Sequence, residues 1–71
     1  MKKVFVVVVE DFGAGVLDST IVLHIRAEGT HSAIRCARET LVSEFFLDDE
    51  TIEDDLDLYA FELKENNIYE A

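Results

Sequence analysis

Residues 3–10 form an almost uninterrupted run of β-branched and aromatic side chains, KVFVVVVE. Such side chains are enriched in strands, so the run predicts a β-strand. Positions 4–9 are all apolar, and because successive side chains point to opposite faces, both faces of this strand are apolar. An edge strand normally carries charge, whereas a strand with two apolar faces fits the centre of a sheet. We therefore expect the fold to be built around residues 3–10.

A second strand is predicted at residues 19–27, after a turn over residues 11–18 that contains glycines. Ile21, Leu23 and Ile25 alternate with more polar positions, so they should face the core. The short connection implies that the first two strands form an antiparallel hairpin.

An amphipathic helix is predicted over residues 30–46, with the Thr30 hydroxyl as its N-cap. Apolar residues recur at the helical period and define an inner stripe. This stripe comprises Ile34, Ala37, Leu41 and Phe45, joined by Ala33 and Thr40.

The remaining chain gives one more strand. Residues 47–55 are polar and predict a loop or one short helical turn. Side chains over residues 56–63 alternate between two faces, which predicts a strand. In this strand we expect Tyr59 and Phe61 to be core residues. Residues 64–71 are expected to be a loose tail, although Ile68 and Tyr69 could dock.

These elements predict one α+β domain over residues 1–71, with the order β-β-α-β. The sheet order should be 2-1-3, with the third strand parallel to the first after a right-handed crossover. One helix covers only one face of a three-stranded sheet. The open face would then be apolar and would serve dimerisation or partner binding.

The net charge of −10 is concentrated in the C-terminal third of the chain. Residues 1–47 carry −1, whereas residues 48–71 carry ten acidic side chains and one basic one. Such a field repels nucleic acid and anionic membranes and attracts basic partners. The longest apolar run has six residues, against the ~20 that a membrane span needs, and Cys36 alone forms no intrachain disulfide. We read the N-terminus as a mature strand and expect a cytoplasmic protein.

Seven carboxylates fall within ten residues of the acidic run. One interpretation is a solvated loop that keeps a small protein soluble. The other is a partner-binding surface that mimics DNA, since residues 55 and 57 on one strand face would stand ~6.6 Å apart, as neighbouring phosphates do. The candidate binding residues are Asp48, Asp49, Glu50, Glu53, Asp54, Asp55 and Asp57.

No catalytic, cofactor or metal site is predicted. The acidic run has no glycine and lacks the spacing of a calcium loop. His24, His31 and Cys36 do not form a zinc or nucleophile motif, and we expect a packed thiol and two ordinary histidines. Gly13-Ala14-Gly15 is followed by a strand, so it does not match a phosphate-binding loop. We therefore expect that the protein is not an enzyme.

The stretch IRAEGTHSAIRCARETL joins a strand to a capped, alanine-containing helix. This pattern resembles HicB-type antitoxins and small phage-encoded host-takeover proteins, including the inhibitor of bacterial RNA polymerase. The resemblance covers about a third of the chain, and it implies a non-enzymatic binder of a host or toxin protein.

The leading hypothesis is a small acidic inhibitor that is encoded by a phage and acts in the host cytoplasm. It would bind a basic, nucleic-acid-binding host protein and would itself contact neither nucleic acid nor membrane. A structural homodimer through the open sheet face, and an antitoxin that neutralises a basic toxin, are the alternatives.

Overall fold

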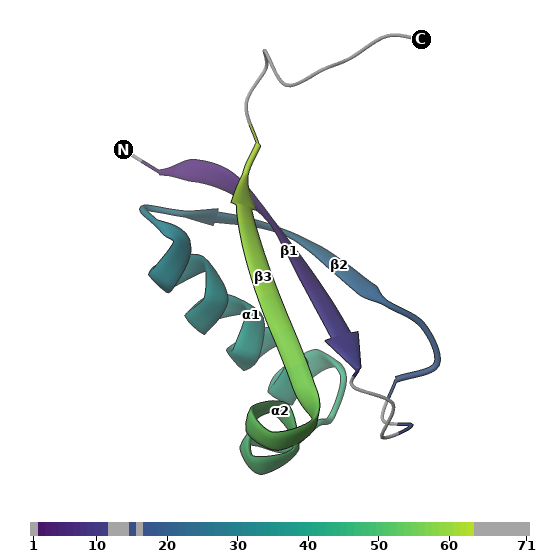
Figure 1. Cartoon of the computed structure of the whole chain (residues 1–71). Coiled ribbons are helices and arrows are strands. Elements are labelled where there is room, and N and C mark those ends of the chain that lie inside the picture. The colour runs from purple at the N-terminus through teal and green to yellow at the C-terminus, as the bar shows by residue number, and fades with distance from the viewer. Residues whose placement is uncertain (1, 12–14, 16, 64–71) are drawn as a thin grey trace, which may run out of the picture.

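The computed structural model describes residues 2–11, 15 and 17–63 and shows a three-stranded sheet with two helices (Figure 1). The sheet order is β2-β1-β3, so the predicted α+β class, the strand order and the central position of the valine-rich strand are confirmed. The elements are β1 (Lys3–Asp11), β2 (Ile21–Ala27), α1 (Thr30–Glu44), α2 (Asp49–Asp55) and β3 (Leu56–Glu62).

The predicted direction of the third strand is wrong, because β3 runs antiparallel to β1. A crossover helix makes the strand that follows it parallel to the strand that precedes it. The strand that precedes α1 is β2, not β1. Since β2 is itself antiparallel to β1, α1 returns the chain to the end of the sheet where β1 finishes. β3 then starts at that end, parallel to β2, with β1 between the two.

The core lies between one face of the sheet and the helices. Phe5, Val7 and Val9 of β1 are buried there. The register places Leu23 of β2 and Ala60 of β3 on either side of Val7, so the same face continues across all three strands. The buried side chains of α1 are Ala33, Ala37 and Leu41, and α2 contributes Ile52.

Neither α1 nor α2 packs on the opposite face of the sheet, which we call the open face (Figure 1). Residues opposite one another in the register share a face, so the open face can be read from the pairing. It comprises Val4, Val6 and Val8 of β1, Val22, His24 and Arg26 of β2, and Tyr59 and Phe61 of β3.

Two core assignments in β3 are therefore wrong. Tyr59 and Phe61 lie on the open face, with 42% and 58% of their surface exposed. The alternate positions Leu56, Leu58 and Ala60 face the core instead. Both sets are apolar, so alternation alone could not decide which one faces the helix.

The ends of α1 also differ from the prediction. Gly29, with extended backbone, occupies the N-cap position, and no side chain caps the helix; Thr30 is the first helical residue. The helix ends at Glu44, and Phe45 is 41% exposed instead of belonging to the buried stripe. The turn residue Gly13 and the tail 64–71 lie outside the described residues.

We expect Leu41→Ala to lower the free energy of unfolding by about 2–5 kcal/mol, because Leu41 is fully buried and its loss leaves a cavity. The neighbouring Val42, which is 39% exposed, provides the matched control, and Val42→Ala should cost less than about 1 kcal/mol. Urea denaturation followed by circular dichroism measures both. Equal effects would contradict this assignment of the core.

Candidate protein-binding surface at the acidic end

The acidic run forms a defined helix, α2, where a loop or a single turn was expected. Asp48 is its N-cap: the carboxylate accepts a hydrogen bond of 2.8 Å from the Thr51 backbone N–H. The Ile52 N–H donates to the Asp48 carbonyl, and the Ile52 side chain is buried. Capping and one buried anchor thus hold a seven-residue helix whose remaining side chains are mostly acidic.

The structure brings six of the seven predicted binding residues together on this one helix and its cap. The seventh, Asp57, lies on β3, on the open face opposite Glu10 of β1. Both strand positions lie at the end of the sheet nearest α2 (Figure 1). We call this set the acidic end, and it comprises Asp48, Asp49, Glu50, Glu53, Asp54, Asp55, Asp57 and Glu10.

The phosphate-like spacing expected of residues 55 and 57 is not present. Asp55 is the last residue of α2, whereas Asp57 already belongs to β3, so the two do not share one strand face. The helix instead displays its carboxylates around its exposed surface.

The charges of the acidic end stabilise the start of the helix but not its later turns. Asp49 and Glu50 in the first turn interact favourably with the helix dipole. Glu53, Asp54 and Asp55 lie in the last turns, where negative charge is unfavourable and the last turn itself contains no basic residue. Carboxylates four residues apart along the helix also repel one another. The chain therefore tolerates an electrostatic cost to display them.

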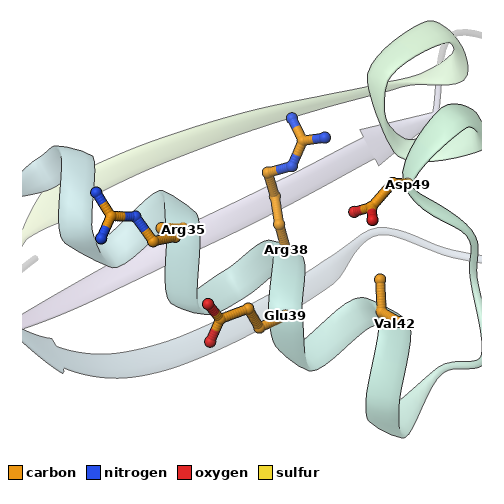
Figure 2. Close-up of a pocket in the computed structure, with 5 residues that line it drawn as sticks. All are labelled: Arg35, Arg38, Glu39, Val42 and Asp49. Carbon is orange, nitrogen blue, oxygen red and sulfur yellow. The ribbon is translucent and has the colours of Figure 1, made fainter.

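One ion pair between the helices limits this cost. The Arg38 guanidinium of α1 lies 2.9 Å from Oε2 of Glu53 in α2. Beside it lies a shallow hollow of about 330 Å³ between the helices (Figure 2). Two arginines and two carboxylates line it, so their formal charges cancel. Its lining residues are Arg35, Arg38, Glu39, Val42 and Asp49.

A second hollow, of about 220 Å³, lies on the outer side of α2. Thr51 and four carboxylates line it, and it is open to solvent. Its carboxylates belong to Asp48, Glu50, Asp54 and Asp55. An open, anionic hollow of this kind suits a lysine or arginine side chain.

Two pKa shifts follow from these contacts. The hydrogen bond from Thr51 lowers the pKa of Asp48 below its ordinary value of 3.8. On the open face, a hydrogen bond to Asp57 and the negative charge of Asp57 raise the pKa of the Tyr59 hydroxyl above 10.0, with a smaller contribution from Glu10. The field of the acidic end therefore reaches the rim of the open face.

Phe46 precedes α2 in the chain, and its exposure was not predicted from the sequence. It follows Phe45, the C-cap of α1; 89% of its surface is exposed, and its φ of 58° is left-handed. The Leu47 N–H then donates to the Leu41 carbonyl and closes the helix end. Glycine usually occupies such a position, because a Cβ is strained there. The double phenylalanine at the end of the amphipathic run was the available signal, but it was assigned to the helix.

The other candidate side chains are not brought into a site. His24, His31 and Cys36 are exposed, so the expectation of a packed thiol was wrong. Within residues 2–11, 15 and 17–63, no three His, Cys, Asp or Glu side chains are grouped to hold a metal ion. Neither helix in this part of the chain is long and apolar enough to cross a membrane.

Comparisons of the chain with protein-family models, curated proteins and solved structures gave no match. The resemblance to HicB-type antitoxins and phage inhibitors stays a prediction based on the strand-to-helix stretch.

We expect the contribution of Asp48 to stability to depend on pH. Because folding lowers its pKa, this contribution is fully present above the ordinary value of 3.8 and is lost as the pH falls through the folded value. Asp48→Asn keeps a capping oxygen without charge, so the variant should be less stable than the native protein at neutral pH, with a gap that closes in acid. Urea denaturation across this pH range measures the gap. Asp54→Asn is the control and should be stabilising at neutral pH, because it removes negative charge near the helix C-terminus.

We expect Phe46→Gly to raise the free energy of unfolding by about 1 kcal/mol, because it relieves the left-handed strain and removes no buried contact. Phe45 has a right-handed φ of −108°, so Phe45→Gly should be destabilising. Thermal and urea denaturation compare the two variants. Destabilisation by Phe46→Gly would contradict the strain argument.

Proposed function

We propose that this protein binds a basic, nucleic-acid-binding surface of another protein through its acidic end and so excludes nucleic acid from that surface. The observation that carries this proposal is the ordered display of carboxylates on α2 at an electrostatic cost to the helix. A loop that served only solubility would need neither a cap nor a buried anchor.

The acidic end offers both a field that attracts a basic partner and a hollow that fits a single cationic side chain. A concentrated negative field accelerates encounter with a basic partner, and this advantage falls as salt screens it. The hollow lined by Asp48, Glu50, Asp54 and Asp55 would then receive a lysine or arginine of the partner. We propose binding and not catalysis for these carboxylates: Asp48, Glu50 and Asp54 are exposed and Asp55 is only partly buried, whereas acid–base chemistry favours carboxylates whose pKa burial has raised.

Phe46 supplies the apolar anchor of the proposed interface. Charged rims add little affinity on their own, and buried aromatic side chains dominate binding energy at protein interfaces. Phe46 lies two residues before Asp48, and its ring is exposed in a strained backbone conformation. Strain retained at an exposed aromatic residue is typical of a binding site.

The test compares two triple variants of equal charge. Asp49→Asn, Glu50→Gln and Asp54→Asn together neutralise three carboxylates of α2, whereas Asp18→Asn, Glu28→Gln and Glu39→Gln together neutralise three exposed carboxylates elsewhere. Each immobilised protein is exposed to lysate from its native host at low and high salt, and retained proteins are eluted with short duplex DNA. We expect the native protein and the control variant to retain a basic protein that DNA elutes, and the α2 variant to lose it.

Phe46→Gly refines the same experiment, since it should fold more stably and yet bind at least about tenfold more weakly. Equal retention by the two triple variants, or a retained protein that duplex DNA does not displace, would count against the proposal. A retained basic toxin without affinity for DNA would favour the antitoxin alternative.

A further inference from the structure

The open face is an unusual surface for a small protein. Tyr59 and Phe61 expose 42% and 58% of their surface, and Val22 exposes 51%. Leu63, whose N–H donates to the Val4 carbonyl, extends the same patch and is 55% exposed. A contiguous apolar surface of this kind normally marks an interface.

The charges at the two ends of the open face have opposite signs. Glu10 and Asp57 lie opposite each other at the end nearest α2. Arg26 lies on β2 opposite Val4, at the other end of the face. Beyond it, the exposed Lys2 and Glu28 offset each other, so Arg26 gives that end its positive charge. The middle of the face between these ends is apolar on β1 and β3.

We propose that two copies of this chain pack open face to open face, with their β1 strands running in opposite directions. The two-fold axis then lies across the strands at the level of Val7 in the register, and so passes between Val6 and Val8 on the open face. Arg26 of each copy lies beside Glu10 of the second copy, and Phe61 packs against Tyr59 of the second copy. The result is an aligned two-layer sandwich, with sheets ~10 Å apart and strands crossing at about 30°.

Charge complementarity selects this arrangement and this occupant. A two-fold axis along the strands would also bring the open faces together, but Glu10 would then meet Glu10 of the second copy with both Asp57 carboxylates close by. Like charges placed together at an interface are costly. The antiparallel arrangement replaces this repulsion by two symmetric pairs between Arg26 and Glu10. A face with an acidic end, an apolar centre and a basic end is thus complementary to itself.

The small area of the face implies a weak dimer. Three strands spaced ~4.8 Å apart cover only part of a standard interface, so we expect dissociation on dilution, with a Kd on the order of micromolar. In this dimer the two α2 helices lie at opposite ends. The carboxylates of α2 in each copy therefore stay exposed, and the dimer does not depend on the function proposed above.

The test is a charge swap measured by sedimentation equilibrium over a range of protein concentrations. Arg26→Glu and Glu10→Arg should each weaken the dimer roughly tenfold, because two-fold symmetry doubles every repulsion, and the double variant should recover most of the native affinity. Within one copy Arg26 lies opposite Val4, six residues from Glu10 along β1. This separation of ~20 Å exceeds the screening length of about 8 Å, so recovery can only arise between copies.

Circular dichroism confirms that each variant is folded, and NMR spectra on dilution give a second readout. In the native protein, dilution should shift the signals of Val6, Phe61 and Tyr59 and leave those of the exposed α1 residue Glu39 unchanged. A protein that is monomeric at all concentrations would overturn the proposal. So would single variants without effect, or a double variant no better than the singles, since both outcomes would indicate pairing through the edges of β2 or β3.

Discussion

The whole structure depends on one strand that is apolar on both faces. β1 pairs with both other strands, and its odd-numbered side chains are buried against the helices. Its even-numbered valines need cover as well, but α1 and α2 both pack on the same side of the sheet. The hairpin of β1 and β2 and the crossover to β3 account for most of the chain. No further segment that the structure describes covers the open face. The same run that makes the fold possible thus also creates an apolar face that neither α1 nor α2 covers.

Most of the fold could be predicted because its elements are encoded by local patterns. The valine run, the alternation in β2 and the helical period of α1 each specify their element independently. The direction of β3 follows from the same order of elements, because a crossover helix makes the strand after it parallel to the strand before it, which is β2. The prediction related β3 to β1 instead. The sequence did not determine which face of β3 is buried, since Leu58 and Tyr59 are both acceptable in a core. Pairing decided it: Ala60 lies opposite Val7, and Ala33 and Ala37 allow α1 to approach this face.

The candidate site was predictable as a set of residues but not as a geometry. The density of carboxylates is evident in the sequence, yet it predicts a loop, because like charges four residues apart disfavour a helix. The helix forms through Asp48, which caps it, and Ile52, which anchors it in the core. Phe46 escaped prediction for a related reason, since backbone conformation at a helix end is set by the path the chain must follow and not by residue preference.

The acidic end and the open face are linked by the residues they share. Glu10 and Asp57 extend the negative charge of α2 onto the rim of the apolar sheet, where the raised pKa of Tyr59 registers their field. This rim disfavours any partner that brings carboxylates to that end of the face and favours one that brings a cation. In the proposed dimer, where the second copy runs in the opposite direction, Arg26 of that copy is the cation. The charge for which we propose a basic partner thereby also favours one orientation in which the apolar face can be covered.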